Sequence, residues 1–307
     1  MIIVITGATG GIGRAAALDL AEAGHDVYAV CRPGKPPPAG CRGLAADLAD
    51  LAQTRALLAQ LPAHVDVLIN NAGVPPTRRL VPVGGRALSA TVVVNLLSPF
   101  LLAYGLLGRV GKVVNVSSAQ HWTGRPITLE TAGQPTVERY ADTKFSLLCL
   151  SLALHKKGVP TVTVNPGYVD TGIWHPRAPY ENIHAPLRKV LALRPEDTAQ
   201  LLRSAVLYTG EKHVYLTPYR TPALFRHLRR CAPAWMLVHD VLGKLAFRSS
   251  GAEVSDSNPR CAAAADGVWR TLLALTAPHH SPTPRRQHPR SPSSAAAPSR
   301  SCGTTPS

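Results

Sequence analysis

The chain has 307 residues, of which 45% are hydrophobic and 17% are charged, a balance typical of a globular protein with a substantial core. Its formal net charge of +15 would suit a nucleic-acid partner, but no recognisable nucleic-acid module accompanies the basic residues, and the basic C-terminal stretch has no Phe, Tyr or Trp. We therefore expect no nucleic-acid partner, and we interpret the charge as a solvated or membrane-facing surface.

Short apolar runs alternate with helical stretches along most of the chain. The runs that predict strands are residues 2–5, 25–32, 65–70, 112–118, 161–167 and 212–219. The stretches that predict helices are residues 15–24, 44–61, 91–107, 141–158 and 196–208. Strands that alternate with helices form a parallel sheet covered on both faces. The sequence therefore predicts an α/β fold built on a doubly wound parallel sheet.

The remaining segments define the expected domain organisation. A final helix is expected at 262–275, which closes a single domain over residues 1–275. Residues 276–307 are a low-complexity mixture of Ser, Pro, Arg, His and Ala, and we expect a disordered tail there. Residues 221–248 form a basic, amphipathic insertion that is too short to span a bilayer. Two interpretations of it stay open: a helix packed on the core or across a dimer, and peripheral membrane contact through residues 226–248.

The cysteines indicate neither crosslinks nor a metal site. Six of them are scattered along the chain without a C-x-x-C pair, and there is no His-x-His cluster. We therefore expect no metal and no disulfide framework, and a reducing, cytoplasmic location, with a peripheral position on a membrane as the variant that the basic insertion suggests.

A glycine-rich turn, "TGATGGIG" at residues 6–13, lies between the first predicted strand and the first predicted helix. The spacing of Gly7, Gly11 and Gly13 suits a tight turn that lets a pyrophosphate approach a helix N-terminus. At this position in the fold, the turn favours a dinucleotide-binding site over a simple connector.

Further motifs follow in order, and together with this turn they resemble the short-chain dehydrogenase/reductase family, in particular the subset of retinol dehydrogenases and carbonyl reductases. The matching positions are Thr6, Gly7, Gly11 and Gly13 in the turn, Asp47 in "AADLAD", Asn70, Asn71, Ala72 and Gly73 after the strand at 65–70, Asn95 in "VVVNLLSPF", Ser118 in "KVVNVSS", Tyr140 with Lys144 in "ERYADTKFSLL", and Pro166, Gly167 and Thr171 in "VNPGYVDT". The resemblance covers about residues 1–220 and implies a Rossmann fold.

The resemblance implies an oxidoreductase with a nicotinamide cofactor and four catalytic residues, Asn95, Ser118, Tyr140 and Lys144. Tyr140 would transfer a proton, and Lys144 would assist it electrostatically and bind the nicotinamide ribose. Ser118 would hold the substrate oxygen, and Asn95 would interrupt its helix and anchor a water near Lys144. The implied cofactor-binding residues are Thr6, Gly7, Thr9, Gly10, Gly11, Ile12, Gly13, Arg32, Asp47, Leu48, Asn71, Ala72, Gly73, Asn95, Tyr140, Lys144, Pro166, Gly167, Val169 and Thr171.

The end of the second predicted strand bears on cofactor choice. Cys31 stands where relatives that prefer NAD carry an Asp, and Arg32 follows it. An arginine suits the 2′-phosphate of NADP, so we expect NADP(H) rather than NAD(H).

The substrate is less well defined by the sequence. The loop at 172–193 carries Trp174, Tyr180 and Ile183, which suit a small lipophilic alcohol or carbonyl such as a retinoid, steroid or quinone, although these side chains could equally pack the loop itself. The alternative to an active enzyme is a catalytically silent dinucleotide-binding protein of the same fold. The helix after Asn95, which commonly forms the dimer contact in the family, looks short, so the oligomeric state stays open.

Overall fold

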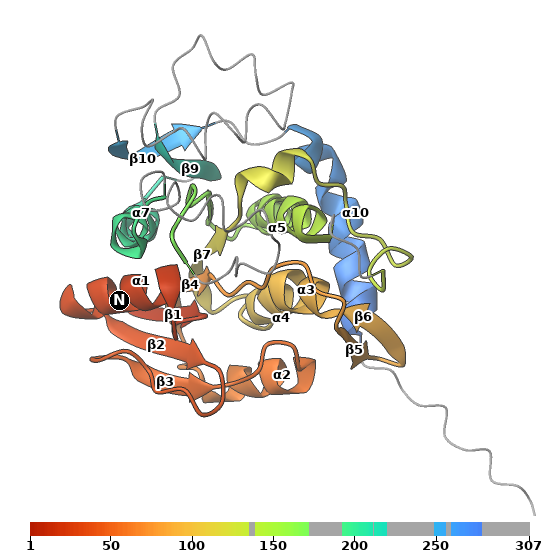
Figure 1. The fold of residues 1–307 in the computed structure, drawn as a ribbon, viewed down its shortest axis with the longest axis horizontal. Helices are drawn as coiled ribbons and strands as arrows, with labels where there is room; N and C mark the ends of the chain where they lie inside the picture. The colour runs from red at the N-terminus through yellow and green to blue at the C-terminus, as the bar shows by residue number, and fades with distance from the viewer. Residues whose placement is uncertain (135–138, 172–191, 211, 220–248, 256–258, 278–307) are drawn as a thin grey trace, which may run out of the picture. The chain divides into compact units, whose positions relative to one another are not determined.

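The computed structural model describes residues 1–134, 139–171, 192–210, 212–219, 249–255 and 259–277 (Figure 1). These residues contain an eight-stranded sheet with the strand order β10-β9-β8-β7-β4-β1-β2-β3, in which every neighbouring pair is parallel except β9 and β10. The strands are β1 (Ile2–Thr6), β2 (Asp26–Cys31), β3 (Arg42–Ala45), β4 (Val65–Asn70), β7 (Val110–Val116), β8 (Thr161–Val164), β9 (Val214–Tyr219) and β10 (Ser249–Ser255). The chain runs outward from β1 to β3, returns to β4 beside β1, and continues in the opposite direction. The predicted doubly wound parallel sheet is confirmed.

Helices cover both faces of this sheet and create two apolar cores (Figure 1). The principal helices are α1 (Gly11–Glu22), α2 (Leu51–Gln60), α4 (Ser98–Gly105), α5 (Arg139–Lys156), α7 (Pro195–Leu207) and α10 (Pro259–Thr276). Helices α1 and α7 pack on one face, where Ile3 and Ile5 of β1 point, and the other four contribute to the core on the face that receives Val4. Successive side chains of β1 therefore enter the two cores in turn, which explains why residues 2–5 are all apolar.

The region between β2 and β4 differs from its prediction. A helix was expected over residues 44–61, but residues 42–45 form strand β3 and the helix begins only at Leu51. Asp50 caps α2 by accepting hydrogen bonds from the backbone N–H groups of Ala52 at 2.8 Å and Gln53 at 3.2 Å. Pairing with β2 holds β3 in place, so a tertiary contact overrides a locally helical pattern.

A small hairpin fills part of the segment between β4 and the following helix. It consists of β5 (Leu80–Val83) and β6 (Arg86–Ser89), which pair antiparallel around Gly84 and Gly85. Both glycines have positive φ values, 54° and 75°, as a tight hairpin turn requires. Neither this hairpin nor β10 was predicted from the sequence.

The final helix, α10, confirms the helix expected at 262–275, and it packs on α5 and contacts α4 through Trp269. Trp269 meets the ring of Phe100 edge-on at 5.2 Å between centroids, and the Lys157 ammonium lies 4.7 Å from the Trp269 ring centroid. The guanidinium of Arg55 donates to the carbonyl of Thr276 and so caps the end of the helix. Residues far apart in the chain thus close one core.

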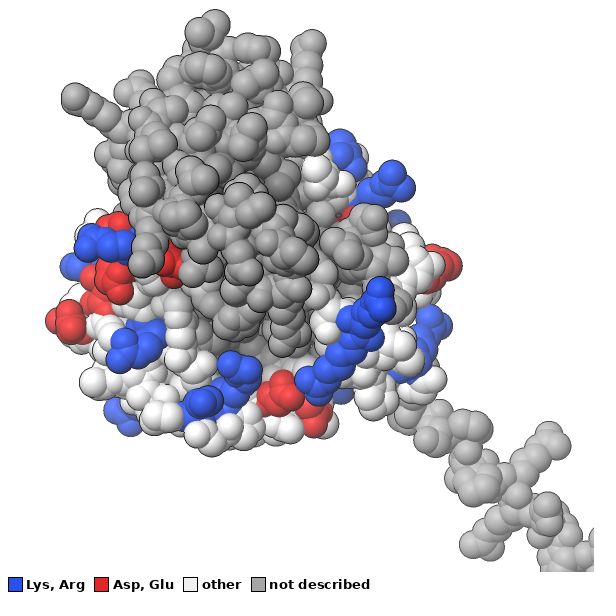
Figure 2. All heavy atoms as spheres, viewed as in Figure 1, with Lys and Arg blue, Asp and Glu red and all other residues white. Residues whose placement is uncertain are grey.

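Several expectations fall on residues that the structure does not describe. They are the basic insertion at 221–248, nearly all of the loop at 172–193, and nearly all of the tail at 276–307. Residues up to Ala277 form one compact unit, and the division into domain and tail stays a prediction. On the face shown in Figure 2, the described acidic and basic side chains are interspersed. Among the described helices, none combines the length and the apolar character needed to cross a bilayer.

Lys112 offers a test of how the last turn of α7 is held. Its ammonium donates to the carbonyl of Val206 at 2.7 Å and also to the carbonyl of Tyr208. We expect Lys112→Met to lower the free energy of unfolding by about 1–3 kcal/mol, because charge-assisted hydrogen bonds to these carbonyls are lost. Urea titration would measure the change.

The matched control is Lys156→Met, which removes an exposed ion pair with Asp266 at 3.1 Å. Exposed pairs contribute little, so this variant should stay within about 0.5 kcal/mol of the wild-type protein. Equal losses in the two variants would contradict the capping role of Lys112.

Candidate functional site

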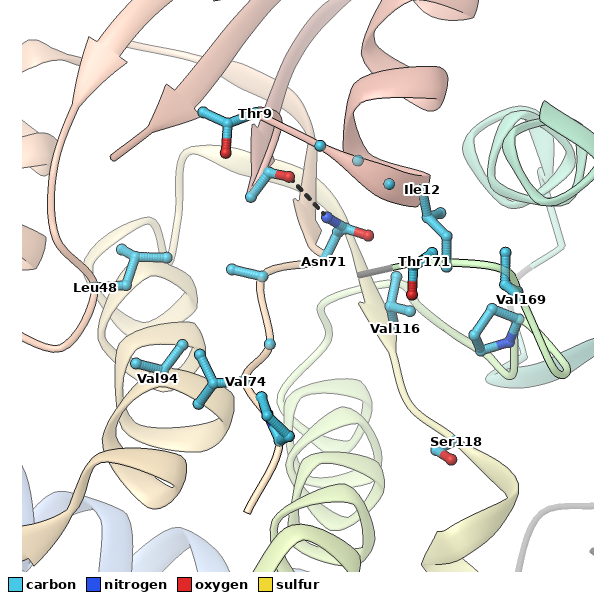
Figure 3. Close-up of a pocket in the computed structure, with 18 of the residues that line it drawn as sticks. Thr9, Ile12, Leu48, Asn71, Val74, Val94, Val116, Ser118, Val169 and Thr171 are labelled. Atoms are coloured by element: carbon cyan, nitrogen blue, oxygen red, sulfur yellow. Dashed lines mark hydrogen bonds between the residues drawn. The ribbon is translucent and has the colours of Figure 1, made fainter. Parts of the chain in front are cut away.

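The carboxyl ends of the parallel strands open onto a cavity of about 570 Å³ (Figure 3). All of the residues predicted to bind a cofactor or act in catalysis line it, except Thr6 and Asn95. Eight further residues line it that the sequence did not single out, namely Val30, Ala46, Val74, Pro75, Val94, Val116, Ser117 and Tyr168. Five of these are next to a predicted site residue in the sequence, namely Ala46, Val74, Val94, Ser117 and Tyr168, so adjacency to the motifs is the signal that would have found them.

The glycine-rich turn brings the N-terminus of α1 to the cavity wall. A Cβ atom on Gly13 would lie 2.3 Å from both the Gly7 carbonyl oxygen and the Asn71 amide nitrogen, so only glycine fits. Gly7 itself has a φ of 71°, in the left-handed region. Helix α1 carries no acidic residue in its first turn, and its first N–H groups have no acceptor within the helix. This end of α1 can therefore bind an anion such as a pyrophosphate.

Thr6 lies behind the cavity and ties two turns together. Its Oγ1 accepts hydrogen bonds from the backbone N–H groups of Asn71 and Ala72, each at 3.0 Å. The Asn71 side chain returns a hydrogen bond to the Thr6 carbonyl at 2.8 Å. Thr6 thus positions the wall formed by residues 71–73, and the structure places it beside the turn rather than on the cavity surface.

Asn95 also lies outside the cavity lining. It is in a π-helical segment, η1 (Val93–Leu97), between the short helix α3 (Ala90–Val92) and α4, so the helix expected over 91–107 is interrupted around it. The Asn95 side chain accepts from the Val74 N–H at 2.8 Å and donates to the Val74 carbonyl at 3.0 Å. These bonds fix the wall at Val74, and a water between Asn95 and Lys144 stays a prediction.

Tyr140 and Lys144 share one face of α5 and line the cavity together. Both are buried, with 5% and 3% of their surfaces exposed, and the Lys144 Nζ lies 5.6 Å from the centroid of the Tyr140 ring. The ammonium donates to the Val116 carbonyl at 2.8 Å, which ties α5 to the end of β7. Burial lowers the pKa of Lys144 to about 8. Below that pH the site presents a cation next to a phenol.

The two serines at the end of β7 have different partners. Ser117 donates from its hydroxyl to the Lys144 carbonyl at 3.1 Å and so braces α5. The Ser118 Oγ accepts from the Gln120 N–H at 3.2 Å, which leaves its hydroxyl hydrogen able to donate into the cavity. This difference favours Ser118, the residue chosen from the sequence, as the donor to a ligand (Figure 3).

The segment that leads from Ser118 to α5 is anchored to α5 and α10. It begins with η2 (Ala119–Trp122). The Arg125 N–H donates to the Asp142 carboxylate at 2.8 Å, and the Ile127 N–H donates to the Ser146 hydroxyl at 2.9 Å. The Arg260 guanidinium reaches from α10 to the Gly124 carbonyl at 2.8 Å. These anchors were not predicted, because their partners are distant in sequence.

Arg32 and Asp47 follow the carboxyl ends of β2 and β3. Arg32 is exposed directly after β2, whereas Cys31 before it is buried. The Asp47 carboxylate accepts from the Ala49 N–H at 2.9 Å, and its own N–H donates to the Gln53 side chain at 2.9 Å. The turn that carries Asp47 and Leu48 into the cavity wall is therefore held by its own side chains.

The segment after β8 faces the N-terminus of α1. Gly167 has a φ of 76°, and its N–H donates to the Asn165 side chain at 3.2 Å, which shapes the turn that starts at Pro166. Thr171 lies close to Gly11: a Cβ atom added to Gly11 would be 3.1 Å from the Thr171 methyl group. Figure 3 shows Ile12, Val169 and Thr171 together, across the site from Val74 and Val94.

In the described part of the chain, His, Cys, Asp and Glu side chains do not gather in groups of three or more that could hold a metal ion.

Known proteins resemble this chain in both sequence and fold. The family described as short chain dehydrogenase matches residues 1–182. Human dehydrogenase/reductase SDR family member 13 is 33% identical over 202 residues, which cover 56% of this chain and 52% of that protein. Bovine retinol dehydrogenase 12 is 31% identical over 197 residues, with coverages of 55% and 61%. The chain thus spans only about half to three fifths of the length of these relatives.

A solved structure of a short chain dehydrogenase from Burkholderia cenocepacia J2315, in complex with NADP, has the same fold. It is 22% identical, with a TM-score of 0.52, and the match covers 70% of this chain and 95% of that one.

The buried ammonium of Lys144 gives a test of the site's electrostatics. Its pKa is about 8 in the folded protein and about 10.5 when solvated, so folding at neutral pH requires a buried charge. Because the folded-state pKa is the lower one, the contribution of Lys144 to stability should be least favourable below pH 8 and should improve as the pH rises toward about 10.5. Thermal unfolding of the wild-type protein and of Lys144→Met, compared across this range, should show the wild type gaining relative stability. A constant difference would contradict the buried charge.

Proposed function

Because the chain belongs to the short-chain dehydrogenase family, we propose that it is an NADP(H)-dependent oxidoreductase that interconverts an alcohol and a carbonyl on a small lipophilic substrate. The observation that carries the proposal is the joint burial of Tyr140 and Lys144 on the wall of the cavity that the N-terminus of α1 also lines. A proton-transfer pair and an anion site thus face the same space.

The residues around the cavity fit a nicotinamide dinucleotide. The glycine cradle at Gly7 and Gly13 would admit the pyrophosphate against the N-terminus of α1. The turn at Asp47 and Leu48 would hold the adenine, and Thr171 would hold the nicotinamide end. When bound, the nicotinamide supplies or accepts the hydride.

The chain's own residues supply the proton. A cation beside a phenol stabilises the phenolate, so the Lys144 ammonium makes the Tyr140 hydroxyl a better proton donor. Ser118 donates a hydrogen bond to the substrate oxygen, where negative charge develops during reduction. The hydrogen bonds from Lys144 to Val116 and from Ser117 to Lys144 hold α5, which carries Tyr140 and Lys144, against the end of β7, next to Ser118.

A lipophilic substrate is supported by the cavity wall and by the relatives. Val74, Pro75, Val94 and Tyr168 present apolar surface to the cavity in addition to the residues of the predicted cofactor site. Retinol, named in the bovine relative, is an apolar alcohol of the kind that such a surface would accept.

Replacement of Tyr140 by Phe tests the mechanism, because it removes the proton donor and keeps the ring. We expect kcat to fall by about 100- to 10,000-fold on whichever retinoid, steroid or quinone the wild-type protein turns over, with NADPH affinity nearly unchanged. Stopped-flow absorbance of NADPH would give the rate, and fluorescence titration would give the affinity.

Wild-type kcat in Tyr140→Phe would rule out this proton donor. A wild-type protein that bound NADPH and turned over nothing on the panel would instead favour the catalytically silent dinucleotide-binding protein.

Cofactor choice can be tested at Arg32, which lines the cavity after β2. A guanidinium there would bind the 2′-phosphate, which NADPH carries and NADH lacks. We expect Arg32→Ala to weaken NADPH binding by about tenfold or more and to leave NADH binding almost unchanged. Titration with both cofactors would measure this. An equal loss for the two would remove the argument for NADP(H).

A further inference from the structure

His121 is fully buried in the short helix η2, three positions after Ser118. Its ring lies between two aromatic side chains, with centroids 5.0 Å from Trp122 and 5.1 Å from Tyr215. The packing fixes the imidazole plane, and Tyr215 of β9 also places its hydroxyl oxygen 3.3 Å from the His121 Nδ1.

The imidazole is bonded to Ser118 itself. Its Nδ1 lies 2.7 Å from the Ser118 carbonyl oxygen, and because a carbonyl only accepts, Nδ1 carries the proton. The same oxygen also accepts from the His121 backbone N–H at 3.1 Å. The ring N–H and the backbone N–H of His121 therefore both hold the peptide group between Ser118 and Ala119.

We propose that His121 is a positioning residue that fixes the orientation of Ser118 toward the cavity. Ser118 leaves β7 in an extended conformation, with φ −165° and ψ 156°, and its Oγ accepts from the Gln120 N–H in the turn that His121 closes. If the turn opened, the Ser118 hydroxyl would lose its hydrogen bond from the Gln120 N–H and would no longer be held toward the cavity. His121 itself does not line the cavity, so it acts through Ser118.

The effect of His121 on catalysis rests on the proposed function, whereas its hydrogen bond to Ser118 does not.

The matched variants are His121→Asn and His121→Gln. Asn carries an amide N–H close to the position of Nδ1, whereas Gln places it one bond farther out, near Nε2. Both are polar and neutral, so they differ mainly in whether they can reach the Ser118 carbonyl.

Hydrogen–deuterium exchange of the peptide that covers residues 117–124 is the first measurement, and it requires no activity. We expect faster exchange than wild type in His121→Gln and a wild-type pattern in His121→Asn. Identical exchange in the two variants would overturn the proposal. If His121→Gln fails to fold, faster exchange in His121→Asn would overturn it and a wild-type pattern would support it.

Kinetics are the second measurement, with rates normalised to sites counted by NADPH binding. We expect kcat to fall by about three- to tenfold in His121→Gln, with NADPH affinity unchanged and His121→Asn close to wild type. In a Ser118→Ala background, His121→Gln should cause no further loss. An additive loss would overturn the positioning role. If the wild-type protein turned over no substrate, the proposed function would fall, and the exchange experiment would still decide the role of His121.

Discussion

The contact between the glycine-rich turn after β1 and the turn after β4 sets the geometry on which the whole site depends. Gly13 leaves no space for a Cβ atom next to Gly7 and Asn71, and Thr6 accepts two backbone hydrogen bonds from the second turn. Helix α1 can therefore begin directly against the Asn71 turn. Its N-terminus and the wall at residues 71–73 then face the same cavity as a consequence of close packing.

The second constraint joins the end of β7, just before Ser118, to the helix that carries Tyr140. Bonds run in both directions, from the Lys144 ammonium to Val116 and from the Ser117 hydroxyl to the Lys144 carbonyl. A buried amine is unfavourable for folding by itself, because burial lowers its pKa and disfavours its charge. The Lys144 ammonium nevertheless lies 5.6 Å from the centroid of the Tyr140 ring, on the wall of the cavity.

The sequence predicted the parts of the fold that depend on local pattern and motif spacing. The apolar strands and the long helices were found in this way, whereas most of the cavity-lining residues followed from the resemblance to the family. Strand β3 was missed because residues 42–45 contain no β-branched side chain and become a strand only by pairing with β2. The places of Thr6 and Asn95 behind the wall depend on hydrogen bonds to Asn71 and Val74, and side-chain direction of this kind is not encoded in motif spacing.

The packing of α10 over α5 has a consequence for the order in which the protein is assembled during synthesis. Residues 139–156 leave the ribosome long before residues 259–276, whose Cys261, Val268 and Leu272 complete the core on that side. Until they arrive, the flank of α5 that packs on α10 lacks this cover. The region around Tyr140 therefore reaches its final packing only after α10 has been made, and until then this flank is an apolar surface that can aggregate or bind chaperones.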